Sequence, residues 1–273
     1  MELRRLAAVM LLISCLLVPV LAISPDFSTY SVQKRYSPSE VIWSEDFNDI
    51  ADWDFWGLHY EDNIPLPANY SVSEGMLRFQ GGANHWTVAM HNTTQSVGTW
   101  SFDLDVQDQY RHLFHIAFIG GYWDNDSIIW PDWRSSVPYE YGIMPVTSQV
   151  YSYADEFVLY WRPTGGADSI YTLDHYRPAE MIGWHHIDIT RNSSGHIDVY
   201  FNGELRMSAE DTHFNVTECF KIYSQGGPAI DNIEINDKIM PPQPQIDPFI
   251  IAVIVGGALV ALVVIVIIIR RRP

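Results

Sequence analysis

Polar and apolar residues alternate through most of residues 40–237, and no segment in this range has helical periodicity. In the segment 99–106, every second side chain is large and apolar, while those between are mostly polar. Successive side chains of a β-strand point to opposite faces, so this spacing predicts a strand with one face in a core. The same pattern predicts further strands at 76–79, 86–90, 113–119, 157–161, 170–173, 186–190, 196–201, 218–222 and 230–235.

One turn in this series has a specific signal. Asn202-Gly203 separates the apolar run 199–201 from 204–207. Asn-Gly is typical of a type I′ hairpin turn, which needs positive φ at both central residues. About a dozen strands without intervening helices predict antiparallel sheets packed face to face, rather than a parallel α/β fold. We therefore expect an all-β sandwich over residues 41–238.

Two apolar ends depart from this pattern. Residues 1–22 combine Arg4 and Arg5 with an apolar stretch, as in a secretory signal peptide; an uncleaved anchor is the alternative. Residues 249–269 contain neither a charge nor a proline, and at 1.5 Å per residue they span about 30 Å, the thickness of the hydrocarbon core. A run of three arginines, 270–272, follows at once, which is typical of a cytoplasmic end.

These ends predict a single-pass protein of the plasma membrane, embedded through one C-terminal transmembrane helix at 249–269. The N-terminal domain lies at the cell surface, and the tail 270–273 is cytoplasmic. Residues 23–40 lead into the sandwich. Residues 239–248 hold four prolines, which lack the N–H that a strand needs, so this stretch is an extended stalk.

Charge narrows the set of partners. The chain has 16 Lys+Arg against 33 Asp+Glu, a net charge of −17, and five of the basic residues lie in the two ends. The outer domain is therefore more acidic than the whole chain. This balance argues against a nucleic-acid partner and favours neutral sugars, cations or basic proteins over polyanions. An aromatic content of 14% is too high for intrinsic disorder.

Sequons and cysteines indicate the compartment. Repeated Asn-x-Ser/Thr sequons are typical of a glycosylated outer surface. Cys219 is the one cysteine outside the signal segment, so the outer domain has no internal disulfide, and we expect this thiol to be buried in a strand. The sequons begin at Asn69, Asn92, Asn125, Asn192 and Asn215.

Two consecutive stretches resemble a known family. They are similar to the central hairpin of concanavalin A-like lectin/glucanase domains, closest to the laminin G-like and pentraxin-like branch. The stretches are Gly183-Trp-His-His-Ile-Asp-Ile-Thr-Arg191 and Gly195-His-Ile-Asp-Val-Tyr-Phe-Asn-Gly-Glu204. The segments 43–48 and 229–233 are similar to the ends of such domains. The resemblance covers residues 41–237. It implies a jelly-roll sandwich of two curved antiparallel sheets, usually with a concave ligand face and sometimes with calcium.

Some members of this superfamily hydrolyse glucans with carboxylates at alternate strand positions, in the pattern Glu-x-Asp-x-x-Glu or Glu-x-Asp-x-Glu. Here Asp103 and Asp105 share a face, and Asp231 and Glu234 lie near the end of the domain, but neither set completes the pattern. We interpret Asp103 and Asp105 as solvated positions of a half-buried strand and as weak catalytic candidates. We therefore expect a binding protein rather than an enzyme.

Metal ligands are sparse in the sequence. His185 and His186 are adjacent in a strand and point to opposite faces, so they do not converge on zinc. Glu45 in the first loop and Asp231 in the closing strand offer the oxygen ligands that calcium prefers. If the terminal strands lie together, these residues would hold a structural calcium ion; an acidic loop without an ion is the alternative.

The stretch 120–142 is the most distinctive in the chain. It holds six aromatic side chains among Gly, Pro and Asp. Flat rings pack on the C–H faces of sugars and carboxylates bind their hydroxyls, so this composition favours a ligand-binding loop; a loop that folds back over the sheet is the alternative. The cluster 52–60 has the same two interpretations. The predicted ligand-binding residues are Tyr122, Trp123, Trp130, Trp133, Tyr139 and Tyr141.

The sequence thus predicts a non-enzymatic cell-surface module that binds glycans through aromatic and acidic loops. One alternative is a glycoside hydrolase of the same fold with a degenerate motif. The other is a structural or adhesion protein whose partner is another extracellular protein.

Overall fold

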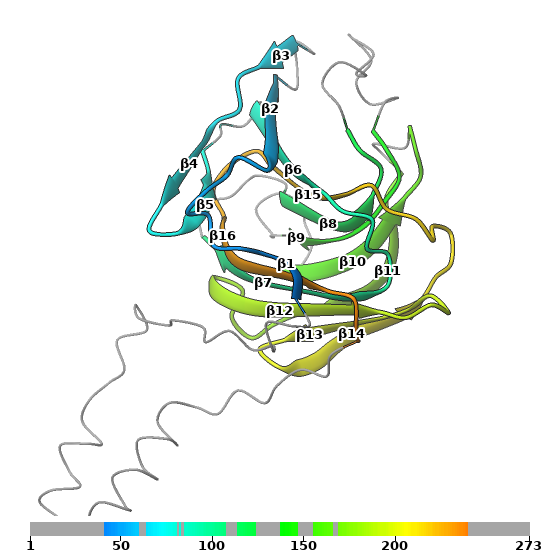
Figure 1. Cartoon of the computed structure of the whole chain (residues 1–273). Helices are drawn as coiled ribbons and strands as arrows, with labels where there is room; N and C mark the ends of the chain where they lie inside the picture. Colours follow the sequence, from blue (N-terminus) through cyan, green and yellow to red (C-terminus); the bar gives the residue numbers. More distant parts are fainter. Residues whose placement is uncertain are drawn as a thin grey trace, which may run out of the picture. The chain divides into compact units, whose positions relative to one another are not determined.

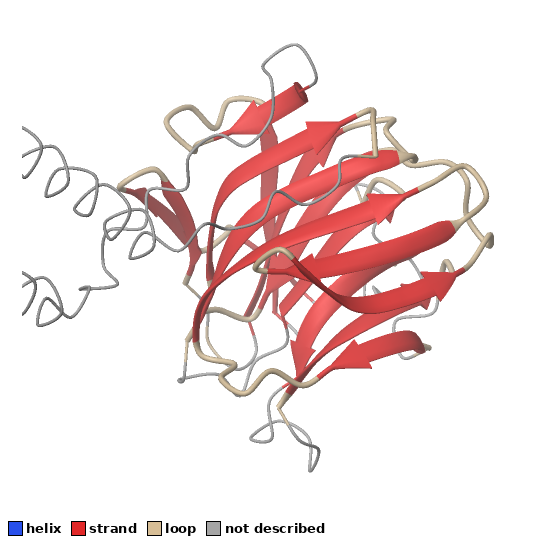
Figure 2. Cartoon of the chain, turned by 90° about the horizontal axis from the view of Figure 1, so that it is seen from below, coloured by secondary structure: helices blue, strands red, loops and turns tan. Residues whose placement is uncertain are grey.

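The computed structural model describes residues 41–59, 64–80, 82, 85–107, 114–123, 137–146, 155–165 and 169–239. All of them belong to one compact unit. All regular secondary structure in these ranges consists of β-strands (Figure 2). The predicted all-β class is confirmed for this part of the chain.

Within the described ranges, sixteen strands form two eight-stranded sheets in which all neighbours are antiparallel. Sheet A has the order β14 (Glu204–Glu210), β13 (His196–Phe201), β12 (Gly183–Arg191), β7 (Gly98–Val106), β16 (Ala229–Asn236), β5 (Met76–Phe79) and β4 (Tyr70–Ser73), and β1 (Val41–Glu45) also pairs with β16. Sheet B has the order β11 (Tyr171–Tyr176), β10 (Glu156–Arg162), β9 (Glu140–Val146), β8 (Phe114–Gly120), β15 (Cys219–Ser224), β6 (His85–Asn92), β2 (Trp53–His59) and β3 (Ile64–Leu66).

The two sheets are curved and stacked (Figure 1). Sheet A lies on the convex side of the stack, and the face of sheet B that is turned away from sheet A lies on the concave side. We call this second surface the outer face of sheet B. Period-2 alternation in the strands of sheet B therefore divides their side chains between the core and this outer face.

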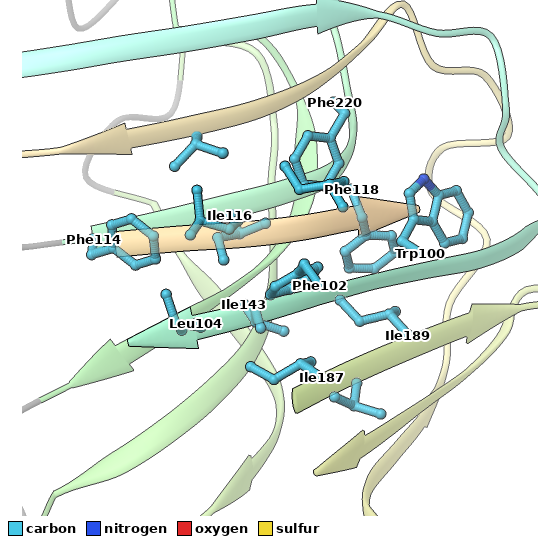
Figure 3. Close-up of a cluster of buried hydrophobic side chains, with 14 of the residues drawn as sticks. Trp100, Phe102, Leu104, Phe114, Ile116, Phe118, Ile143, Ile187, Ile189 and Phe220 are labelled. Atoms are coloured by element: carbon cyan, nitrogen blue, oxygen red, sulfur yellow. The ribbon is translucent and has the colours of Figure 1, made fainter. Parts of the chain in front are cut away.

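The core lies between the sheets. Alternate residues of β7 and β12 in sheet A face alternate residues of β8, β9 and β15 in sheet B (Figure 3). Burying one such large apolar side chain contributes about 1.5–3 kcal/mol, so this layer is the main source of stability. The side chains labelled in Figure 3 are Trp100, Phe102, Leu104, Phe114, Ile116, Phe118, Ile143, Ile187, Ile189 and Phe220.

The predicted hairpin is confirmed. Asn202 and Gly203 join β13 to β14 and have φ values of 52° and 84°. These are the positive angles that a type I′ turn requires. The Asn202 side chain also accepts a hydrogen bond from the backbone N–H of His186, at 3.0 Å, which ties the turn to β12.

Two segments interpreted as aromatic loops are partly strands. The segment 53–59 is β2, and β9 begins at Glu140, inside the predicted loop 120–142. The loop interpretation was wrong there because almost all side chains of β9 are buried on both faces. Such a strand shows no polar–apolar alternation, and Pro138 and Gly142 resemble loop punctuation.

No helix in the described ranges is long and apolar enough to cross a membrane. The predicted signal peptide 1–22, lead 23–40, transmembrane helix 249–269 and tail 270–273 lie outside those ranges, as does all of the predicted stalk 239–248 except Ile239.

Candidate functional site

Charged and polar side chains are buried on the outer face of sheet B. Four neighbouring strands, β10, β9, β8 and β15, contribute them. All are at most 4% exposed. We call this group the Glu140 cluster; its members are His115, Glu140, Tyr160, Arg162, Lys221 and Tyr223.

Strand register brings the cluster together. Arg162 of β10 lies directly opposite Glu140 of β9, and Tyr223 of β15 lies opposite His115 of β8. Tyr160 lies opposite Gly142, where an added Cβ would be 2.6 Å from the Tyr160 hydroxyl oxygen. Glycine at 142 therefore makes the room in which the Tyr160 hydroxyl reaches Glu140.

The Glu140 carboxylate of β9 accepts hydrogen bonds from side chains of two other strands, β10 and β15. Its Oε1 lies 2.7 Å from the Tyr160 hydroxyl, 2.6 Å from the Tyr223 hydroxyl and 2.6 Å from Arg162 Nη2. Its Oε2 forms an ion pair with Lys221 Nζ at 2.8 Å. One carboxylate thus faces two cations and two hydroxyl donors, which is the kind of compensation that a buried charge requires.

The protonation states follow from this arrangement. Burial opposes ionisation of Glu140, but Arg162 and Lys221 outweigh it and hold the pKa of the carboxyl well below its usual range. Burial, with Arg162 nearby, lowers the pKa of His115 to about 3. Burial and the Glu140 carboxylate raise the pKa values of Tyr160 and Tyr223. At neutral pH the carboxylate is therefore ionised, while the imidazole and both phenols are neutral.

Aromatic rings surround the cluster. The rings of His115 and Tyr223 stack with centroids 4.5 Å apart, and Trp86 lies 5.5 Å from Tyr223. Trp123 lies edge-on to Trp56 at 4.8 Å, and Lys221 Nζ is 5.9 Å from the Trp123 ring centroid. The buried layer on this side of sheet B therefore combines flat apolar rings with hydrogen-bonding and charged groups.

At one rim of this face an aromatic ring is partly exposed. Tyr122 follows β8; its backbone N–H donates to Glu218 Oε2 at 2.7 Å and its hydroxyl donates to Asp54. Asp54 and Glu218 are exposed. The rim thus presents one phenol ring beside two solvent-accessible carboxylates. We call Asp54, Tyr122 and Glu218 the rim.

The predicted ligand-binding residues do not form one surface. Trp123 is 3% exposed and packs on the outer face of sheet B, whereas Tyr141 is fully buried in the core between the sheets. Tyr141 points to the other side of sheet B, donates to Asp211 and offers no ring face to a ligand. Its assignment as a ligand-binding residue was wrong, because it belongs to β9 rather than to a loop. Tyr139 is partly exposed and packs 4.7 Å from Phe214, while Trp130 and Trp133 lie outside the described residues.

The weak catalytic candidates lie on the outer face of sheet A, away from the Glu140 cluster. Asp103 is only 5% exposed and accepts hydrogen bonds from His186 Nδ1 at 2.6 Å and Asn232 Nδ2 at 2.9 Å. Asp105 accepts one from Gln107 Nε2 at 2.9 Å. The expectation of a solvated Asp103 was therefore wrong: a histidine on the neighbouring strand pairs with it and allows it to be buried.

A serine, a histidine and an aspartate on this face lie at the distances of a catalytic triad, but their protons are not placed for catalysis. They are Ser101, His186 and Asp103. Ser101 Oγ is 3.1 Å from His186 Nε2, yet the hydroxyl donates its one hydrogen to Asp188 Oδ1 at 2.7 Å. Burial opposes protonation of His186, but hydrogen bonds to Asp103 and Asp188 prevail and raise its pKa. A protonated imidazole between two carboxylates is not a general base for the serine.

The predicted calcium ligands lie near each other but are not assembled into a metal site. β1 pairs with β16, as expected of terminal strands, with Glu45 opposite Ile233. Both Glu45 oxygens already accept hydrogen bonds, from the Phe47 N–H at 2.5 Å and Trp53 Nε1 at 2.9 Å. Within the described ranges no three His, Cys, Asp or Glu side chains are placed to hold a metal ion.

The fold raises the pKa of the Asp231 carboxyl group. Burial raises its pKa to about 6, and the Asp103 and Asp46 carboxylates add to this, although the Asn232 N–H opposes it. The folded state therefore holds this proton more tightly than the unfolded state, so stability falls as pH rises from about 4 to about 6 and the penalty is complete above that. The penalty is smaller than the shift alone implies, because the side chain is only partly buried.

Replacing Asp231 with Asn tests this assignment. We expect Asp231→Asn to raise the free energy of unfolding by about 1 kcal/mol at pH 7.5 and to leave it unchanged at pH 4, because only the ionised carboxylate is unfavourable. Urea denaturation at both pH values measures the difference. Asp237→Asn, at an exposed position six residues further along the chain, is the control and should show no such pH dependence. An equal gain at both pH values would contradict the electrostatic origin.

The sequons divide by exposure. Asn69, Asn92 and Asn215 are exposed, whereas Asn192 is half-buried and its Oδ1 accepts hydrogen bonds from the turn that follows it. Asn125 lies outside the described residues. Glycosylation at these five positions stays a prediction. Cys219 is a buried free cysteine in β15, as expected.

The Glu140 cluster was not predicted from the sequence. Its members occur one at a time in apolar strands, and a single charged residue in such a strand is usually interpreted as solvent-exposed. The available signal was Lys221, which lies between Phe220 and Ile222 in a predicted strand, and Glu140, which lies between two tyrosines. A charged residue in a strand whose two faces are both apolar needs a buried partner.

No family model matches this sequence, and no curated protein matches it either. Solved structures do resemble its fold. The metal-free carbohydrate recognition domain of Emp46p has a TM-score of 0.54 at 8% identity and covers 74% of this chain and 96% of that domain. A Bacillus subtilis protein of unknown function with a galectin-like fold has a TM-score of 0.53 at 11% identity, covering 72% of this chain and 96% of the other.

A third similar structure is the kappa-carrageenase from Pseudoalteromonas carrageenovora in complex with an oligotetrasaccharide of kappa-carrageenan. Its TM-score is 0.51 at 13% identity, and it covers 75% of this chain and 98% of the enzyme chain. Identities this low show the fold alone, and they leave the narrower laminin G-like or pentraxin-like assignment a prediction. The chain therefore shares the jelly-roll fold of these structures, one of which is described as galectin-like.

Proposed function

We propose that this domain binds glycans, without hydrolysing them, on the outer face of sheet B. The observation that carries the proposal is the rim, where the partly exposed Tyr122 ring lies beside the exposed carboxylates of Asp54 and Glu218. A flat ring accepts the C–H face of a pyranose, and carboxylate oxygens accept hydrogen bonds from its hydroxyls.

The fold supports the same conclusion. Structures with this jelly-roll fold include a domain described as a carbohydrate recognition domain and an enzyme crystallised with an oligosaccharide. Fold alone does not define function, because one fold hosts unrelated activities. The rim is the feature of this chain's own residues that fits a sugar.

Binding fits this face better than hydrolysis. Glycosidases generally need two carboxyl groups, about 5–5.5 Å or 6.5–9.5 Å apart, on either side of the scissile bond. Among the buried side chains described in sheet B, Glu140 is the one carboxylate. Three hydrogen-bond donors and Lys221 occupy it, and its lowered pKa keeps it from acting as a general acid.

We also infer that the domain is displayed on the outer surface of the cell. The support is in the sequence: an apolar segment at 249–269 followed by three arginines, an N-terminal signal and five sequons. Protease treatment of intact cells tests this arrangement. Digestion of the domain in intact cells supports it, and protection until the cells are lysed contradicts it.

A substitution in the rim tests the glycan-binding proposal. With the purified full-length protein on a glycan array, we expect Tyr122→Ala to weaken binding to the best-bound glycan at least tenfold, which corresponds to about 1.4 kcal/mol. The loss follows from removing the ring face that contacts the sugar.

Tyr171→Ala is the matched control. Tyr171 is 50% exposed and its ring stacks on Trp161 at 4.4 Å, in the edge strand β11 rather than at the rim. Its replacement should leave glycan binding within twofold of the unmodified protein. If both tyrosine variants lose binding equally, or if the unmodified protein binds no glycan, the proposed site is wrong.

A further inference from the structure

The Glu140 cluster contains more positive than negative charge. Arg162 and Lys221 are cations, and Glu140 is the one carboxylate that contacts them among the described residues. His115, Tyr160 and Tyr223 add no charge at neutral pH. The described part of the cluster therefore carries a net charge of +1, in a chain whose net charge is −17.

This excess charge is buried. Glu140 and Lys221 are fully buried and Arg162 is 4% exposed, so water compensates it poorly. Burying an uncompensated charge is costly, and proteins usually balance it with a counter-charge or hydrogen bonds. The cluster is thus electrostatically incomplete within the residues that the structure describes.

Unsatisfied hydrogen-bond donors also indicate that the described part of the cluster lacks an acceptor. Lys221 Nζ carries three donors, and apart from its ion pair with Glu140 it has no acceptor among the described residues. Arg162 Nη2 bonds to Glu140 and Tyr223, but its Nε has no partner in the same part of the chain. One further oxyanion would balance the net charge of the described cluster and give Lys221 Nζ a second acceptor.

We propose that the glycan bound on this face carries one anionic group, a uronate carboxylate or a sulfate ester, that pairs with Lys221 and Arg162. This inference rests on the proposed glycan binding. Trp123 follows the rim residue Tyr122 directly and its ring packs over Lys221. Because this ring covers the ammonium, the proposal requires that the ring moves aside when the acidic group binds.

The charge of the whole protein limits how acidic the ligand is. At −17, the protein repels polyanions at long range, while the cluster offers compensation for a single negative charge. The preferred ligand is therefore an otherwise neutral oligosaccharide with one acidic group, not a chain with an acid on every residue.

The test is a glycan array with the full-length protein and its Lys221→Met variant. The array holds neutral, uronate-bearing, sialylated and singly sulfated oligosaccharides, so its arms also distinguish carboxylate from sulfate. We expect the unmodified protein to prefer singly acidic glycans at least tenfold over neutral ones of the same sequence, and Lys221→Met to remove this preference. Binding of neutral glycans alone overturns the inference and leaves glycan binding intact; binding of no glycan overturns both.

Thermal melting separates a binding role from a structural one. Met is close to Lys in length, and without the ammonium Glu140 keeps Arg162 and both tyrosines as partners. We expect the Tm of Lys221→Met to equal or exceed that of the unmodified protein in the absence of ligand, because the excess charge is gone. A Tm as low as that of Glu140→Gln would show that Lys221 is already compensated within the protein, and would overturn the proposal.

Discussion

Glu140→Gln is expected to lower the free energy of unfolding by about 3–5 kcal/mol. The amide has almost the same shape as the carboxylate, so packing is preserved while the charge is lost. Arg162 and Lys221 then remain buried as two cations without a counter-ion. Urea denaturation at pH 7 measures the change, and the denaturation midpoint should shift without a change in the slope.

Glu204→Gln is the matched control for this charge removal. Glu204 also pairs with an arginine, Arg206, but both side chains are well exposed, at 67% and 39%. Ion pairs in water contribute less than about 1 kcal/mol, so this variant should be nearly as stable as the unmodified protein. Equal, small effects of the two substitutions would contradict the electrostatic interpretation of the Glu140 cluster.

The second large effect is expected in the core. Trp100 of β7 is fully buried between the sheets, with its ring 5.2 Å from that of Phe118 (Figure 3). Trp100→Ala removes the buried ring and leaves a cavity, so the free energy of unfolding should fall by about 3–5 kcal/mol. Urea denaturation followed by circular dichroism measures this loss.

Trp100→Phe and Trp184→Ala serve as controls. The Trp100 indole N–H has no hydrogen-bond partner among the described residues, so Phe should recover most of the stability by restoring an apolar ring. Trp184 lies in β12 and is 44% exposed, so Trp184→Ala should cost less than about 1 kcal/mol. A loss at Trp184 as large as that at Trp100 would contradict the placement of the core.

The alternation along β7 and β13 was enough to predict those strands and their buried faces. Each has one apolar face, so the pattern is visible within a few residues. Alternation failed for β9, because the face opposite Tyr141 and Ile143 carries Gly142 and Met144 rather than a row of polar side chains. Tyr141 was assigned to a ligand loop for the same reason, although it faces the core.

The Asn202-Gly203 turn was predictable because its cause is local. Few residues other than Asn and Gly adopt two successive positive φ angles at low cost, whatever the rest of the protein does. By contrast, the pairing of Asp103 with His186 depends on β7 lying beside β12 in one particular register. The sequence contained both residues but no sign that they meet.

The sequence by itself determined the β class, the hairpin and the acidic character of this protein, since these depend on neighbouring residues or on composition. Tertiary structure alone decided where the charges gather. Glu140 bonds to Arg162, 22 residues away, and to Tyr223, 83 residues away. Strand order and register place these side chains on one face, and burial then gives their contacts the strength that charges lack in water.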